Sequence, residues 1–193
     1  MKKLITITLF TLFFFLSVFS VPAKAEIIAG SSAPLTHQSF IADKDIERDI
    51  EVVKEKQLKV VIESVLNRYS SPLASESDSF VKACIKYEID CYLLPSIAGL
   101  ESTFGKFIYP NSHNPFGWGG GLIMFDKWSD SIDAVAKGLK NNYYDKGANT
   151  VDSIAPIYSE SPTWAVRVNF FVNQFQKEEE KLSLLSNQFP VQL

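Results

Sequence analysis

The sequence predicts a mainly α-helical protein with one small β-hairpin. Apolar residues recur at three- and four-residue spacings in several separate segments, as they do on the buried face of an amphipathic helix. The predicted helices cover residues 45–69, 77–87, 90–104, 129–144, 150–158 and a last segment that starts at Ser161-Pro162. Three consecutive glycines before the apolar run 122–125 indicate the hairpin. At 193 residues, the chain has room for one domain of ordinary size and additional segments.

The first 25 residues have the features of a secretory signal peptide. Met1-Lys2-Lys3 is basic, residues 4–21 are apolar, and Ala23-Lys24-Ala25 is a typical cleavage site. We therefore expect cleavage after Ala25 and a secreted protein outside the cytoplasm, in the cell wall or the periplasm. The apolar run is also nearly long enough to span a bilayer, so an uncleaved membrane anchor is the alternative.

The charge of the chain excludes some classes of partner. Removal of residues 1–25 takes away three of the 19 Lys and Arg residues and none of the 22 Asp and Glu residues, which leaves a formal charge of −6. This negative net charge does not resemble the basic surface of a nucleic-acid-binding protein, and it gives no reason to expect attraction to anionic lipid. We therefore expect no nucleic-acid partner, and a membrane contact only if the signal segment is retained. Two isolated histidines, His37 and His113, are too few for a zinc site, and we expect no metal and no cofactor.

Four further segments follow the signal peptide. Residues 26–44 are mixed in composition and predict a flexible leader. Residues 45–71 predict an amphipathic helix that is either docked on the main domain or projects as a stalk, and the break at Ser70-Ser71-Pro72 ends it. The main domain covers residues 72–177. Residues 178–193 form a C-terminal tail whose structure the pattern does not assign.

Two cysteines, Cys84 and Cys91, flank a predicted break between two helices. A disulfide across this corner is compatible with the oxidising environment of an exported protein. A catalytic pairing of a cysteine with His113 is the alternative. Cys84 continues an apolar helical row with Phe80 and Tyr87, which favours the disulfide.

One acid stands at the end of an apolar helix. Glu101 continues the row of Leu94 and Ala98, and Gly105 offers a typical helix stop, so Glu101 lies near the negative end of the helix dipole. Apolar neighbours and the dipole both disfavour the ionised carboxylate. A carboxylic acid that keeps its proton near neutral pH can act as a general acid, which makes Glu101 the candidate catalytic residue. A surface glutamate at a frayed helix end is the alternative.

The segment after Glu101 combines amide, hydroxyl and aromatic groups. Asn114 follows other polar residues, and Phe116, Gly117 and Trp118 begin an aromatic, glycine-rich loop. Sugars bind through ring faces that stack on aromatic side chains, and glycines let a bulky ligand approach the backbone. The loop therefore predicts a sugar-binding site. A hairpin whose aromatic side chains fill the core is the alternative.

Taken together, these residues resemble the glucosaminidase domain of bacterial endo-β-N-acetylglucosaminidases, a family of the lysozyme-like superfamily. Glu101-Ser102, Gly105-Lys106 and Asn114-Pro115-Phe116-Gly117 are similar to the E-S-x-x-G-K … N-x-F-G signature of that family. The resemblance continues through residues 125–132, 139–144, 154–158 and 164–168, and it covers roughly residues 72–175. It implies a lysozyme-like helical bundle with the hairpin at the cleft.

The resemblance also implies an activity. The protein is expected to be a glycosidase that cleaves peptidoglycan or a related N-acetylglucosamine polymer, with Glu101 as the general acid and Tyr158 assisting at the reacting sugar. Sugar-binding roles are implied for Ser102, Asn114, Phe116, Gly117 and Trp118. The chain departs from the family pattern after Tyr158, where the usual small residue is Ser159 and Glu160-Ser161-Pro162 follows. It also departs at Trp118, where the family often has an aliphatic residue.

The sequence leaves the second reacting group open. Glycoside cleavage generally needs one group at the leaving oxygen and another at the oxocarbenium face. Asp126 is a candidate, although a cap for the helix over residues 129–144 is as natural a role for it. Alternatively, the N-acetyl group of the substrate acts, or its muramyl hydroxyl acts and makes the protein a lytic transglycosylase. Three hypotheses remain: a glucosaminidase-like hydrolase, a lytic transglycosylase on the same scaffold, and a catalytically inactive glycan-binding module.

Overall fold

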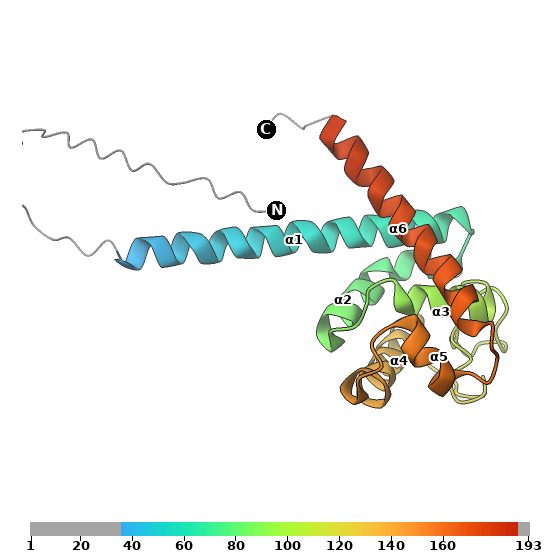
Figure 1. The fold of residues 1–193 in the computed structure, drawn as a ribbon. Helices are drawn as coiled ribbons and strands as arrows, with labels where there is room; N and C mark the ends of the chain where they lie inside the picture. Colours follow the sequence, from blue (N-terminus) through green and yellow to red (C-terminus); the bar gives the residue numbers. More distant parts are fainter. Residues whose placement is uncertain (1–35, 189–193) are drawn as a thin grey trace, which may run out of the picture.

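The structure, a computed structural model, describes residues 36–188 and confirms a mainly α-helical protein (Figure 1). The helices are α1 (Thr36–Arg68), α2 (Ser77–Tyr87), α3 (Leu93–Ser102), α4 (Trp128–Asn142), α5 (Val151–Tyr158) and α6 (Trp164–Gln188). Short 3-10 helices cover Pro72–Glu76 and Tyr144–Lys146. None of the described helices is long and apolar enough to cross a membrane. The predicted signal peptide, residues 1–25, lies outside the described residues.

Helix α3 lies at the centre of the core. Its residues Leu93, Leu94, Ile97 and Ala98 are buried, and the first turn of the helix tolerates Pro95 because a backbone N–H there has no intrahelical partner. In the view of Figure 1, α2, α4 and α5 lie below α1, and α6 crosses α1 and descends to the level of α3. The C-terminal end of α3 emerges from the core, which determines where Glu101 points.

Helix α1 has two parts with different surroundings. It begins at Thr36, so residues 36–44 of the predicted leader belong to the helix, and it ends at Arg68. From Leu58 onward its apolar residues are buried in the core, except for Val60; the buried ones are Leu58, Val61, Ile62, Val65 and Leu66. Before Leu58, α1 projects away from the body of the protein (Figure 1). The docked helix and the stalk, which the sequence offered as alternatives, thus describe different parts of one helix.

Helix α6 continues beyond the predicted end of the main domain. It runs from Trp164 to Gln188 without a break at residue 177, and Glu178 is buried against α1. The Glu178 carboxylate accepts a hydrogen bond from Ser64 (2.9 Å) and forms an ion pair with Arg68. The first part of the predicted tail is therefore a helix that is anchored to α1.

The predicted disulfide is confirmed in position. The sulfur atoms of Cys84 and Cys91 lie at bonding distance, and the two Cα atoms are 4.9 Å apart. The pair joins the end of α2 to the segment that enters α3. Glu88 ends α2 in a left-handed conformation with a φ of 51°. The bridge therefore crosses the corner between two helices, as the sequence predicted.

The predicted β-hairpin is not confirmed. Residues 103–127 form turns and bends, and no strand is present among residues 36–188. Gly119, Gly120 and Gly121 adopt φ values of 63°, 73° and 79°, whereas an extended strand needs a strongly negative φ. The side chain of Asn114 binds the backbone of the same loop and takes the place of a strand ladder. This segment is called the cleft loop below.

Candidate active site

Glu101 lies in the last turn of α3, where the buried row of Leu94 and Ala98 leaves the core. Its side chain is exposed, so the apolar surroundings predicted for it are wrong. The reason is that α3 ends one residue later, at Ser102, and the row continues into a surface pocket. Oε1 of Glu101 accepts a hydrogen bond from Nε1 of Trp164, which is 3.1 Å away. The acid is therefore accessible and also held in one orientation.

The pocket beside Glu101 has a volume of about 350 Å³. Its lining joins the end of α3, the cleft loop, the residue after α4, and the end of α5. The lining residues are Glu101, Phe116, Gly117, Trp118, Gly119, Gly120, Tyr143, Tyr158 and Ser159. Five of the predicted site residues meet here: Glu101, Phe116, Gly117, Trp118 and Tyr158.

Aromatic rings form one wall of the pocket. The ring of Tyr158 stacks on Trp164 with 4.7 Å between centroids, and it lies 5.9 Å from Tyr143 and 6.3 Å from Trp118. Burial raises the pKa of the Tyr158 phenol, and the negative charge of Glu101 raises it further. Tyr158 therefore keeps its proton at neutral pH and can donate a hydrogen bond into the pocket.

Ser102 and Asn114 support the cleft loop, and neither lines the pocket. The side chain of Asn114 donates to the carbonyl oxygens of Trp118 (2.9 Å) and Ile123 (3.2 Å) and accepts from the Trp118 N–H (3.0 Å). The hydroxyl of Ser102 lies 2.7 Å from the carbonyl oxygen of Pro115, to which it can donate. Both side chains are buried, and their polar atoms are used within the protein. Their predicted contact with sugar is therefore replaced by a role in shaping the loop.

Two glycines shape the surroundings of the pocket, one through its backbone conformation and the other through a close approach. Gly117 has a φ of 61°, and a Cβ atom there would lie 3.9 Å from Oε2 of Glu101. Gly138 of α4 lies under Trp118, because a Cβ at this position would come within 2.6 Å of the indole ring. The positive φ favours glycine at position 117, and the absence of a side chain at Gly138 lets the ring of Trp118 pack against α4.

Asp126 and Asp130, the acids near the cleft loop, do not line the pocket. Asp126 is exposed, and Asp130 lies 3.7 Å from Nζ of Lys127. Lys127 caps α4 with its backbone, and no side chain bonds the cap. Among the described residues that line the pocket, Glu101 is the single carboxylate.

Sequence reasoning missed Trp164 and Tyr143 as members of the site. Trp164 lies 63 positions after Glu101, so no local pattern links the two residues. The available signal was the predicted helix start at Ser161-Pro162, which placed Trp164 in the first turn of the last helix; the helix begins at Trp164 itself. Tyr143 was interpreted as part of a helical face, whereas it lies just after the end of α4.

No protein-family model matches the sequence, and no similar curated protein was found.

Proposed function

We propose that this protein is a glycosidase that cleaves peptidoglycan or a related polymer of N-acetylglucosamine, with Glu101 as the general acid. The observation that carries the proposal is a single oriented carboxylate in a pocket walled by aromatic rings. Aromatic faces suit the apolar faces of sugar rings, and an accessible carboxylic acid can protonate a glycosidic oxygen. The resemblance of residues 72–175 to glucosaminidase domains supports the same activity and a lysozyme-like fold.

The hydrogen bond from Trp164 supports a specific proton position. An indole N–H is only a donor, so Oε1 of Glu101 acts as the acceptor in this contact. When Glu101 is protonated, its proton is therefore carried by Oε2. This is the oxygen that lies nearest Gly117 in the cleft loop. The geometry supports proton delivery from Oε2 to a glycosidic oxygen bound between Glu101 and the loop.

The aromatic residues have separate roles in this proposal. Trp118, which is partly exposed, provides apolar surface for the sugar rings, while Tyr158 donates a hydrogen bond at the reacting sugar. The ring of Phe116 is buried in the core, so its predicted contact with sugar is replaced by a role in packing the cleft loop. Trp164 orients Glu101 and does not itself need to touch the substrate. Ser102 and Asn114 act indirectly, because they fix the backbone that carries Phe116 and Trp118.

A lytic transglycosylase is the second candidate, and the composition of the pocket favours it. Since Glu101 is the single carboxylate among the described lining residues, a group on the substrate is a natural partner for it. In that reaction, Glu101 gives its proton to the leaving oxygen. The C6 hydroxyl of the muramyl residue then bonds to C1, its proton returns to Glu101, and the product is a 1,6-anhydro sugar. In the hydrolase, water supplies the oxygen bonded to C1.

Digestion of purified cell wall, followed by mass spectrometry of the released fragments, tests the proposal. Hydrolysis gives a reducing end that contains the oxygen of water, whereas transglycosylation gives an end that is one water lighter. Borohydride reduction before analysis identifies the sugar at a reducing end and thus the bond that is cut. Binding to the wall without any released fragment would contradict both enzyme hypotheses and would leave the inactive glycan-binding module.

A further inference from the structure

A row of exposed apolar residues runs along the projecting part of α1 and ends at Val60, beside the docked part. The exposed fractions are 57% for Ile46, 63% for Ile50, 55% for Val53 and 51% for Val60. With Gln57 included, the steps between these residues are four, three, four and three. This alternation is the 3.5-residue repeat of a coiled coil. We call Ile46, Ile50, Val53, Gln57 and Val60 the α1 seam.

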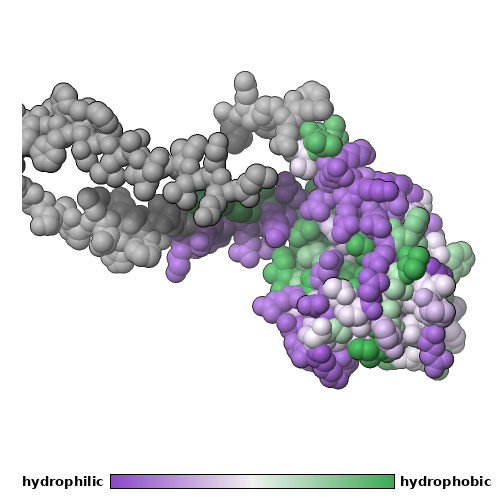
Figure 2. Space-filling model, viewed as in Figure 1, coloured by the Kyte–Doolittle hydropathy of each residue, from purple (hydrophilic) through white to green (hydrophobic). Residues whose placement is uncertain are grey.

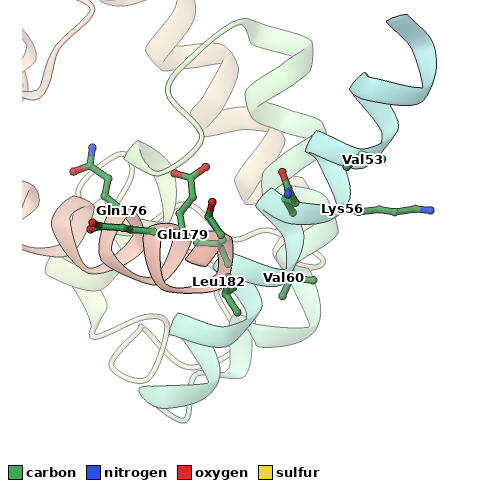
Figure 3. A pocket seen from close by; sticks show the side chains of 10 residues that line it. Val53, Lys56, Val60, Gln176, Glu179 and Leu182 are labelled. Atoms are coloured by element: carbon green, nitrogen blue, oxygen red, sulfur yellow. The ribbon is translucent and has the colours of Figure 1, made fainter. Parts of the chain in front are cut away.

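The row of the α1 seam leads to Ser64, four residues after Val60, whose hydroxyl bonds to Glu178 of α6. Before that contact, the seam residues are exposed. Ile46, Ile50, Val53 and Gln57 line one shallow groove, which Glu179 of α6 borders. Toward the core, the seam enters a deeper groove of about 600 Å³ between α1 and α6. Figure 3 shows this deeper groove, with Val53 and Val60 on α1 and Leu182 on α6. Along the projecting part of α1, hydrophobic and hydrophilic surface lie side by side (Figure 2).

Charged residues flank the α1 seam in a polarised order. Glu47 and Asp49 lie beside its first half, and Lys54 and Lys56 lie beside its second half. In coiled-coil terms, Glu47 and Lys54 share one flank, and Asp49 and Lys56 share the other. All four residues are exposed. A second helix of the same sequence places its basic half beside the acidic half of the first only if the two helices are antiparallel.

We propose that the α1 seam binds a second copy of this chain, with the two α1 helices antiparallel. Ile50 of each copy packs against the partner's Val53, and Ile46 packs against the partner's Gln57. On the flanks, Asp49 pairs with the partner's Lys56, and Glu47 pairs with the partner's Lys54. The two-fold symmetry produces each pair twice, so four ion pairs surround the apolar contact.

A parallel arrangement satisfies fewer of these contacts. In parallel coiled coils, the flanking pairs join one flank of a helix to the opposite flank of its neighbour, five residues later. In that arrangement, the single kind of opposite-charge pair joins Asp49 to the partner's Lys54. The symmetry of the dimer produces this pair twice. Gln57 would face the partner's Gln57 in the apolar contact. The charges therefore favour the antiparallel register over the parallel one.

The expected dimer is weak and depends on salt. Two four-turn helix segments form a contact smaller than a standard interface, which buries about 1,600 Å². Each exposed ion pair contributes only about 0.2–1 kcal/mol and is screened by salt. We therefore expect an association that increases with protein concentration and decreases as salt is added.

Sedimentation equilibrium of the purified protein over a range of concentrations tests the dimer. We expect the mean mass to rise toward that of two chains at low salt, and Ile50→Asp to abolish this rise. Because Ile50 is exposed, the melting temperature of the dilute variant should stay at the parent value. A parent protein that remains monomeric at every concentration would overturn the proposal. Dimerisation that Ile50→Asp leaves unchanged would also overturn it.

Two matched charge-swap variants then test the orientation. Asp49→Lys with Lys56→Asp restores every antiparallel pair and makes the parallel pair repulsive. Asp49→Lys with Lys54→Asp makes every antiparallel pair repulsive and restores the parallel one. The two variants have the same composition and net charge, and circular dichroism verifies that both keep their helix. We expect the first variant to dimerise like the parent and the second to be monomeric. The reverse result, or equal behaviour of the two variants, would overturn the antiparallel register.

Discussion

The pocket around Glu101 and the α1 seam are both exposed, but they differ in what lies behind their side chains. In the pocket, Trp164 holds the acid from one side, and the buried side chain of Asn114 holds the cleft loop from beneath. On the seam, the side chains belong to one helix, most of which projects from the body, and α6 borders only the end near Gln57 and Val60. The helix fixes the spacing of these side chains, but it does not hold their conformations.

This difference indicates two kinds of ligand. A pocket whose groups are fixed before binding suits a rigid, compact group such as a sugar, because little ordering is needed on binding. A row of apolar side chains with charges on both flanks suits an extended partner that contacts it along several turns.

The largest effect is expected at Glu101. Glu101→Gln keeps the size of the side chain and an oxygen for the Trp164 N–H, but the amide cannot deliver a proton. General acid catalysis contributes about 10²–10⁴ in rate, which equals about 3–5 kcal/mol of barrier. We therefore expect release of cell-wall fragments to fall by that factor, with an unchanged melting temperature.

Glu160→Gln is the matched control for this loss, because Glu160 is an exposed glutamate outside the pocket. The control should digest cell wall like the parent. Near-parent digestion by Glu101→Gln would remove this residue from the mechanism. It would also remove the main reason to regard the pocket as an active site.

The next prediction compares the effect of the same substitution, isoleucine to alanine, in the two parts of α1. Ile62 is fully buried in the docked part, and Ile50 is exposed in the projecting part. Ile62→Ala should lower the free energy of unfolding by about 2–5 kcal/mol, because it leaves a cavity in the core. Ile50→Ala should change it by less than about 0.5 kcal/mol in dilute solution. Urea unfolding measures both values, and equal losses would mean that the projecting part is covered within one chain.

The sequence predicted the helices better than the site, and particular residues explain why. Helix-forming patterns are local, so the predicted helix over residues 129–144 agrees with α4 (Trp128–Asn142) within two residues at each end. The hairpin prediction was wrong because it relied on the apolar run 122–125. It did not account for the Asn114 side chain, which donates a hydrogen bond to the backbone of this loop. The contact between Glu101 and Trp164 joins the ends of two separate helices, and only the packing of α3 against α6 creates it.

The anchor between α1 and α6 predicts a pH dependence. Burial opposes ionisation of Glu178, but the Ser64 hydroxyl and the charges of Arg68 and Lys181 together lower the pKa of Glu178 below its ordinary value of 4.5. A carboxyl group whose pKa is lower in the folded state stabilises the protein above its unfolded pKa. This stability is lost as the pH falls through the folded value.

Glu178→Gln should therefore cost about 1 kcal/mol at neutral pH and should reduce the loss of stability below pH 4.5. Denaturant unfolding at several pH values measures both effects. Glu180→Gln is the control, because Glu180 is exposed on the same helix. An unchanged acid transition in Glu178→Gln would show that Glu178 is not an anchor of α6.

The smallest change in stability is expected at Gly138, under the pocket. A Cβ added by Gly138→Ala would lie 2.6 Å from Cζ2 of Trp118, so the indole ring must move away from α4. Alanine in place of glycine within a helix adds about 1 kcal/mol of helix propensity, which offsets part of this clash. The melting temperature should therefore change little, while the aromatic wall of the pocket is displaced.

Binding of N-acetylglucosamine oligomers, measured by calorimetry, should weaken about tenfold in Gly138→Ala, which corresponds to about 1.4 kcal/mol. This is within the range of a single aromatic contact, about 0.5–1.5 kcal/mol. Lys137→Ala is the matched control, because Lys137 is the exposed neighbour on α4 and does not line the pocket. If Gly138→Ala binds the oligomers as tightly as Lys137→Ala does, Trp118 is not part of the sugar-binding surface. Its ring would then serve only to pack the cleft loop against α4.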